Sequence, residues 1–118
     1  MTTVTFHSAD SRIDGFVVEG HSGYAEEGAD IVCAAISAAV GLAECTINEV
    51  MGIGAQVKVK EKDARISLKL PAALNDPSDD LCQTVMTGML VYLQAMAEEY
   101  PDNLTVLLDD DDDEDQAP

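Results

Sequence analysis

Two long segments of helical periodicity divide this 118-residue chain into groups of shorter, strand-like segments. Apolar residues recur at steps of three and four in residues 31–51 and 81–96, which is the spacing of one buried helix stripe. Five shorter segments alternate apolar and polar residues or are rich in β-branched residues, namely 2–7, 13–19, 56–62, 65–70 and 104–108. The order ββαββαβ predicts a single small α+β domain, with a mostly antiparallel sheet of about five strands and two long helices.

The two helices have predicted starts, ends and buried faces. Asp30 is expected to cap the first helix, because its carboxylate can accept a backbone N–H of the first turn, and Gly52 is expected to end it. The stripe of this helix is predicted to be Ile36, Val40, Ala43, Ile47 and Val50. The second helix is expected from Asp76 and Pro77, with the stripe Leu81, Val85, Met89, Leu93 and Met96. Both stripes are expected to face the sheet.

Composition limits the size and the compartment of the fold. With 47% hydrophobic residues, the chain suits one compact domain. Its apolar stretches are expected to fall short of the roughly 20 residues that a membrane span needs, and its first residues do not resemble a signal peptide. The thiols of Cys33, Cys45 and Cys82 form neither a CxxC pair nor an even framework. We therefore expect a cytoplasmic protein with reduced thiols and no membrane association.

Acidic residues dominate the charge of the chain. The formal net charge is −17, and the seven acids from Asp109 to Asp115 contribute −7 of it, which leaves −10 on the rest. A surface of this sign repels nucleic-acid phosphates and favours basic partners, so no direct nucleic-acid binding is expected. We predict a domain over residues 1–108 and an acidic, disordered tail over residues 109–118. An electrostatic contact of the tail, or self-inhibition at a cationic site, is the alternative.

Cys33 follows His21 by twelve positions, and the segment between them contains glycines but no apolar periodicity. If Asp30 caps the helix, Cys33 is its third residue and lies in the first turn, where the helix dipole lowers a thiol pKa. His21 could then act as general base and acid, and N–H groups near Ile31 to Cys33 could bind an oxyanion. The pattern predicts a cysteine hydrolase.

Asp30 and Ser37 are candidates for supporting roles around Cys33. Asp30 could orient His21 instead of capping the helix. Ser37 lies one turn after Cys33, where its hydroxyl could bond the Cys33 carbonyl or polarise a pocket. Each residue also has a simpler interpretation, with Asp30 as a cap alone and Cys33 as an inert packed thiol, since cysteine is among the most buried residue types.

Gly23 and Gly28 bracket the segment before the first helix. They could let it open and close over an extended peptide, with Tyr24 lining the groove. The same glycines could equally be ordinary turn residues. Cys45 and Cys82 are interpreted as core or incidental thiols.

The remaining histidine and the basic residues are interpreted as surface features. His7 ends a strand, where a surface or capping role is expected. Five of the six basic residues fall in the middle hairpin and predict a solvated strand face that guards against edge pairing, namely Lys58, Lys60, Lys62, Arg65 and Lys69. No metal and no cofactor are expected, because the histidines and cysteines lack the spacing of ligand pairs.

Two stretches resemble the signature of the bacterial ribosomal-processing cysteine protease family, called Prp. They are Gly-His-Ser-Gly-Tyr-Ala at residues 20–25 and Gly-Ala-Asp-Ile-Val-Cys-Ala-Ala-Ile-Ser at residues 28–37. In length and element order the resemblance extends over about residues 2–108. It implies a catalytic dyad of His21 and Cys33, supported by Asp30 and Ser37. The substrate loop that it implies contains Gly20, Ser22, Gly23, Tyr24 and Gly28.

The resemblance also implies an activity and partners. The expected enzyme is a cytoplasmic homodimer that removes the N-terminal extension of a large-subunit ribosomal protein. The acidic tail is not part of the family pattern, so no role is inferred for it from the family. Two alternatives remain, a non-catalytic ribosome-associated module that binds basic protein segments and a thiol-based redox sensor.

Overall fold

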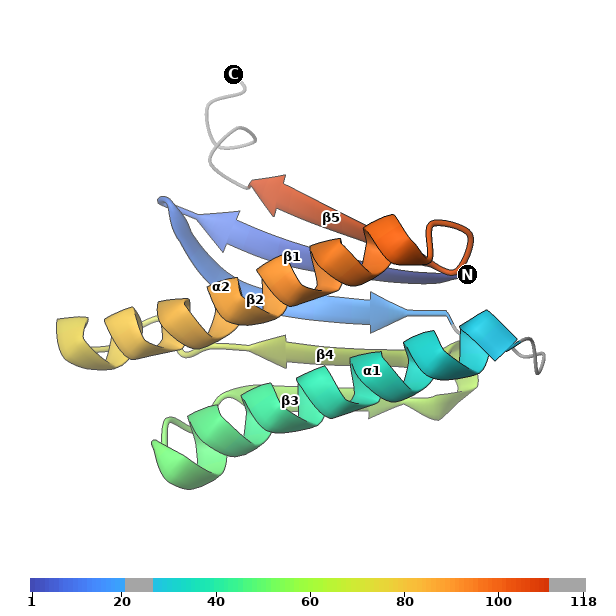
Figure 1. Ribbon diagram of the computed structural model, residues 1–118. Helices are drawn as coiled ribbons and strands as arrows, with labels where there is room; N and C mark the ends of the chain where they lie inside the picture. Colours follow the sequence, from blue (N-terminus) through green and yellow to red (C-terminus); the bar gives the residue numbers. More distant parts are fainter. Residues whose placement is uncertain (21–26, 111–118) are drawn as a thin grey trace, which may run out of the picture.

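The computed structural model describes residues 1–20 and 27–110 (Figure 1). Along these residues the order of strands and long helices is ββαββαβ, as predicted. The elements are β1 (Thr2–Ala9), β2 (Arg12–Glu19), α1 (Glu27–Glu44), the π-helical η1 (Cys45–Val50), β3 (Gln56–Lys60), the 3₁₀ turn η2 (Glu61–Asp63), β4 (Arg65–Lys69), α2 (Asp76–Glu99) and β5 (Leu104–Asp110).

The five strands form one sheet in the order β3-β4-β2-β1-β5. Three of the neighbouring pairs are antiparallel, and β5 pairs with β1 in parallel. The predicted mostly antiparallel sheet is therefore confirmed. The parallel pair arises because β5 returns to the sheet after α2 has crossed it, and so runs in the direction of β1 (Figure 1).

Both helices cover the same face of the sheet, with α1 on the side of β3 and β4 and α2 on the side of β1 and β5 (Figure 1). The core lies between these two layers. Phe6 and Phe16 are fully buried there, with ring centroids 5.8 Å apart. Because side chains alternate along a strand, every second residue of β1, including Val4 and Phe6, points at the helices and the rest point away.

Polar contacts hold α2 on the β1–β2 hairpin. The Gln83 side chain accepts a hydrogen bond from the Ile13 N–H at 2.7 Å and donates one to the Ile13 carbonyl at 2.8 Å. The Arg12 guanidinium forms an ion pair with Asp79 at 2.8 Å. The helix is thereby held in position at its first turns as well as by its apolar stripe.

Helix α1 begins at Glu27, four residues before the predicted first helical residue Ile31. Asp30 is therefore inside the helix and does not cap it, which corrects the sequence-based prediction. Gly28 also lies in the first turn of α1, so it does not bracket a loop. A capping residue and a residue of the first turn have similar sequence preferences, because an acidic side chain is favourable at both.

The apolar stripe of the first helix is confirmed except at its end. Ile36, Val40 and Ile47 are buried, but Val50 is 76% exposed, and Met51 packs against the core instead. The π-helical turn η1 holds more residues per turn than an α-helix and rotates the residues that follow. The prediction for Val50 was therefore wrong.

Helix α2 is capped by Asn75, whose side chain accepts a hydrogen bond from the Ser78 N–H at 2.9 Å. Its predicted stripe is correct at Met89 and Leu93. Leu81, however, is 57% exposed, and Cys82 is fully buried in its place. Residues 82 and 86 have the same four-residue spacing as residues 81 and 85, so periodicity alone could not choose between the two stripes.

The helical segment from Ile31 to Val50 is long and apolar enough, by length and composition, to cross a membrane. The expectation that every apolar stretch falls short of a span was therefore wrong. In this structure, Val32, Ile36 and Ile47 from the segment are buried against the sheet. The core helix of a folded domain can meet the same criteria of length and composition as a membrane-spanning helix.

Candidate active site

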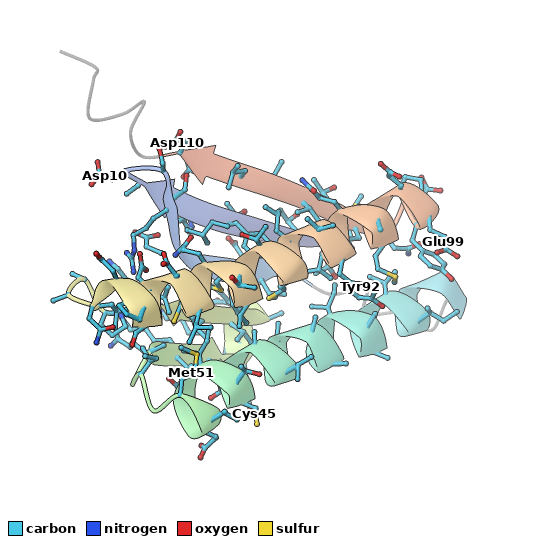
Figure 2. The ribbon with its side chains drawn as sticks, turned by 60° about the vertical axis from the view of Figure 1, so that its left-hand side comes forward. Asp10, Cys45, Met51, Tyr92, Glu99 and Asp110 are labelled. Atoms are coloured by element: carbon cyan, nitrogen blue, oxygen red, sulfur yellow. The ribbon has the colours of Figure 1, made fainter. Side chains whose placement is uncertain are left out.

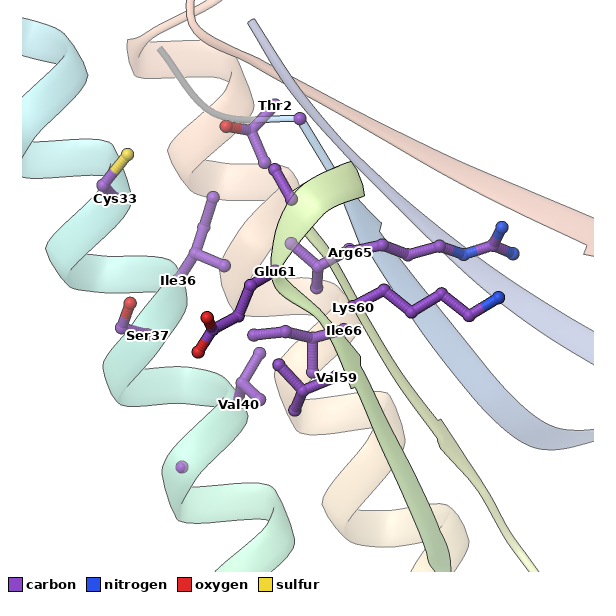
Figure 3. A pocket seen from close by; sticks show the side chains of 14 residues that line it. Thr2, Cys33, Ile36, Ser37, Val40, Val59, Lys60, Glu61, Arg65 and Ile66 are labelled. Carbon is purple, nitrogen blue, oxygen red and sulfur yellow. The ribbon is translucent and has the colours of Figure 1, made fainter. Parts of the chain in front are cut away.

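A pocket of about 480 Å³ lies between α1 and the β3–β4 hairpin (Figure 3). Much of its lining is apolar, with Ile36 and Val40 from α1 facing Val59 and Ile66 from the hairpin. Cys33 lies at one end of this lining. The pocket therefore places a thiol beside an apolar groove that is open to solvent.

Cys33 and Ser37 reach the pocket because of their position on α1. They follow the buried residues Val32 and Ile36 by one position each, so they form a row along the edge of the core-facing stripe. Cys33 is half-buried and Ser37 is exposed. Figure 3 shows both side chains on the helix that forms one wall. The predicted proximity of Ser37 to Cys33 is thus found in the structure.

The helix start changes the predicted environment of Cys33. Cys33 is the seventh residue from Glu27, about 9 Å along the axis from the start of α1, so it lies in the second turn. The dipole effect on a thiol declines after the first turn. The backbone N–H groups of Ile31 to Cys33 lie past the first four residues, where helical N–H groups already bond to carbonyls. The predicted first-turn activation and these oxyanion donors are therefore corrected.

Gly20 connects β2 to the pocket. It lines the same pocket as Cys33, and its N–H donates a hydrogen bond to the Ala64 carbonyl at 3.0 Å. Its φ of +74° favours glycine, and a β-carbon here would lie 2.9 Å from the Met1 carbonyl oxygen. In the sequence, His21 therefore directly follows a residue that lines the pocket.

Several predicted site residues lie outside what the structure describes. They are His21, Ser22, Gly23 and Tyr24, and the side chain of Asp30 is also not described. The predicted pairing of His21 with Cys33 accordingly stays a prediction. The described part of the chain holds no cluster of three or more metal-ligating side chains.

Charged residues surround the hairpin side of the pocket and were not identified from the sequence as part of a site. Lys60, Glu61 and Arg65 are among its lining residues. Figure 3 shows the side chains of Lys60 and Arg65 pointing away from α1, whereas the Glu61 carboxylate points toward it. No sequence spacing relates this hairpin to Cys33, because the two segments meet only where α1 packs on the strands of the hairpin.

The other two cysteines have different surroundings. Cys82 is fully buried in the core, as interpreted from the sequence. Burial, and secondarily the Asp79 carboxylate, raise the pKa of the Cys82 thiol above its usual 9.0, while Arg12 opposes this. Cys45 is exposed at the end of the first helix (Figure 2). Of the three thiols, Cys33 alone lines the pocket beside α1.

A model of the cysteine protease Prp family matches residues 1–105. The chain belongs to this family. The ribosomal processing cysteine protease Prp of Bacillus subtilis (strain 168) is 30% identical over 99 residues, which cover 84% of this chain and 88% of that protein. The Prp of Staphylococcus aureus (strain NCTC 8325 / PS 47) is 26% identical over 98 residues, covering 80% and 86%. As a member of the Prp family, the protein is a cysteine protease.

Solved structures agree with the family assignment. The essential ribosomal processing protease Prp from S. aureus, in complex with a substrate peptide, superposes with a TM-score of 0.78 at 25% identity, over 92% of this chain and 99% of that one. SMU.848 from Streptococcus mutans superposes with a TM-score of 0.83 at 24% identity, over 93% and 95%. The second match concerns the fold alone. The α+β architecture is thus that of Prp structures.

Proposed function

We propose that this protein cleaves a ribosomal protein precursor, with Cys33 as nucleophile and His21 as general base and acid. The observation that carries the proposal is that Gly20 and Cys33 line one pocket. Because His21 is bonded to Gly20, the histidine follows directly from a residue of the site. No other described cysteine lies in this pocket.

The proposed reaction has two steps. The Cys33 thiolate attacks the scissile carbonyl carbon, and the C–N bond breaks as His21 donates a proton to the leaving amine. Water then attacks the resulting thioester while His21 accepts a proton from it, and the C–S bond breaks, which releases the acid product and regenerates the Cys33 thiolate. Ser37 is proposed as a supporting residue on the groove wall, and Asp30 as an acidic side chain of the first helical turn.

The groove supports an extended peptide as substrate. Its walls of Ile36, Val40, Val59 and Ile66 suit an apolar side chain, because burial there removes apolar surface from water. The net charge of −17 suits a basic ribosomal protein and disfavours nucleic acid. We therefore propose that the substrate is a large-subunit ribosomal protein with an N-terminal extension. We also propose that the protease domain spans the predicted residues 1–108 together with Asp109 and Asp110, which belong to β5. The segment Gly20 to Gly28, with Ser22, Gly23 and Tyr24, is proposed to contact the peptide.

The test compares two cysteines of the same helical segment. Cys33→Ala is expected to lower the cleavage rate of the precursor by at least about 10³-fold, since the nucleophile is lost. The control Cys45→Ala removes a thiol outside the pocket and is expected to leave cleavage unchanged. Both products are identified by mass spectrometry. Cleavage by Cys33→Ala at the rate of the native chain would refute the assignment.

A non-catalytic module that binds basic protein segments is the alternative for the same fold. It predicts that the native chain binds the precursor and leaves it intact, and that Cys33→Ala binds equally well. Equilibrium binding to the precursor, measured beside cleavage, separates the two functions.

We also propose that the protein is a cytoplasmic homodimer. An apolar groove runs between α1 and α2, and Leu42 and Tyr92 beside it are 71% and 51% exposed. Figure 2 shows Tyr92 between the two helices. Contact with a second copy would remove this surface from water.

The substitution Leu42→Glu should halve the mass measured by light scattering, and the control Leu108→Glu, on β5, should not. An unchanged mass for Leu42→Glu would exclude this interface.

A further inference from the structure

The face of the sheet opposite the helices carries most of the basic residues. We call it the open face. Strand register places every second residue of each strand there, and four of the six basic residues are among them: Lys58, Lys60, Arg65 and Lys69. All four are exposed. Cations therefore gather on one side of a chain whose net charge is −17.

These four cations have few anionic neighbours. Among the described residues, no carboxylate forms an ion pair with any of them. Glu19 is the cross-strand neighbour of Arg65, and Asp14 borders the open face near Lys69. The four cations therefore carry positive charge that is not neutralised by an ion pair among the described residues, and such a cluster can attract an anion.

A hollow of about 230 Å³ is present within this cluster. Lys58, Arg65 and Lys69 line it, and Gly15 forms part of its floor. A β-carbon at Gly15 would clash with the Leu68 carbonyl oxygen, so the position excludes a side chain and keeps the hollow open. The hollow is thus wide enough for a carboxylate, and its lining contains three cationic side chains against one acidic residue, Asp14.

The acidic run of the chain leaves the sheet beside this hollow. Strand β5 ends at Asp110, and the Asp109 carboxylate lies 3.3 Å from His7 on β1. In the strand register, Asp109, His7, Gly15 and Lys69 form one row across the open face. Figure 2 shows Asp110 at the same end of the sheet as Asp10, the end at which the β1–β2 turn lies.

The chain after Asp110 is long enough to cross this row. From β5 to β4 is three strand spacings, about 14 Å at about 4.8 Å each. Residues 111–115 could extend over about 17 Å. All five of these residues are acidic, being four aspartates and Glu114. The segment is therefore long enough to reach the cations, and its charge is opposite to theirs.

We propose that the carboxylates of residues 111–115 bind in the hollow of the open face, against Lys58 and Lys69. A segment tethered this closely has an effective concentration in the millimolar range, so even weak charge pairing is populated. The bound segment would shield the cationic surface from other anions, including nucleic acid. The contact does not involve the proposed nucleophile, because Cys33 lies on the other face of the sheet, and Arg65 is the residue that lines both the hollow and the Cys33 pocket.

The first test is zero-length carbodiimide cross-linking of the full chain. Amide cross-links are expected between the carboxylates of residues 111–115 and Lys58 or Lys69. Their yield should be at least about fivefold higher than the yield of cross-links to Lys62. Lys62 is an exposed lysine of the η2 turn and does not line the hollow, so it serves as an internal control. A mixture of ¹⁴N and ¹⁵N protein shows whether the links form within one chain. In 1 M salt, where the Debye length is about 3 Å, the links should decline.

The second test changes charge without shortening the chain. One variant converts the acids of residues 111–115 to their amides, and a matched control converts five acids elsewhere, namely Glu49, Asp80, Glu98, Glu99 and Asp102. The first variant should shift the backbone amide resonances of Gly15, Lys58 and Lys69, and the control should not. Cross-linking to Lys62 as often as to Lys69, or unchanged resonances in the first variant, would overturn the proposal. Equal binding of a labelled oligonucleotide to the native chain and the first variant would also overturn it, because the segment would then leave the cations accessible.

Discussion

The two faces of the sheet are made by the same five strands and differ in almost every physical property. The face under the helices holds Phe6, Phe16 and Leu68 in a dry core, whereas the open face presents Lys58, Lys69 and neighbouring polar residues to solvent. Alternation of side chains along each strand produces this separation. The first face provides the packing that stabilises the fold and positions Cys33, and the second face carries the exposed basic residues.

The comparison shows why a small domain can hold two kinds of surface. Burial on one face requires only every second residue of a strand, so its neighbours can change without loss of the core. Thr5 and Phe6 illustrate this, because they are adjacent in β1 and point to opposite faces. A substitution on one face should therefore have little effect on the other. The first measurement below tests this separation, and the next two test what stabilises the face under the helices.

Phe6→Ala should have the largest effect. The ring is fully buried and packs on Phe16, so its removal leaves a cavity and should lower the free energy of unfolding by about 3–5 kcal/mol. The control Thr5→Ala changes the open face and should cost about 1 kcal/mol or less. Urea denaturation measures both. Similar losses for the two variants would contradict the separation of the faces.

Gln83→Ala should have an intermediate effect. It removes both hydrogen bonds to Ile13 and leaves that backbone N–H and carbonyl without their partner, which should cost about 1–3 kcal/mol. Gln94, an exposed residue of the same helix, is the matched control, and Gln94→Ala should be nearly neutral. Equal stability of the two variants would show that apolar packing alone places α2 on the hairpin.

The smallest effect should be the pH dependence due to Cys82. The folded chain holds the Cys82 proton more tightly than the unfolded chain, because burial raises its pKa above 9.0. Its contribution to stability is therefore complete below pH 9 and is lost as the pH rises through the higher value. Unfolding free energies from pH 8 to 10.5 should decline more steeply for the native chain than for Cys82→Ala. Parallel curves would refute this.

Much of the fold could be predicted because it depends on local periodicity. The predicted strand that contains Val4 and Phe6, and the predicted stripe from Ile36 to Ile47, were correct because the direction of a side chain follows from its near neighbours in the sequence. The errors came where two local solutions were nearly equal. Leu81 and Cys82 both fit a four-residue repeat, and Asp30 suits a cap and a first turn alike.

The candidate site was predicted in part. The motif around His21 and Cys33 was sufficient to indicate a cysteine protease of the Prp family, which the family model confirms. It did not reveal that Val59 and Ile66 would form the opposite wall of the pocket. These residues are more than 25 positions from Cys33, and no spacing along the chain relates them.

By itself, the sequence determined the helices, most strand faces and the family, because these depend on periodicity and on residue types within short segments. Only the tertiary structure decided that Cys33 lies in the second turn of α1, that Gly20 and the β3–β4 hairpin meet it, and that the basic residues share an open face beside the acidic run. The physical reason is that distant segments are brought together by burial of a common core. That burial depends on how the whole chain packs, whereas periodicity depends only on neighbouring residues.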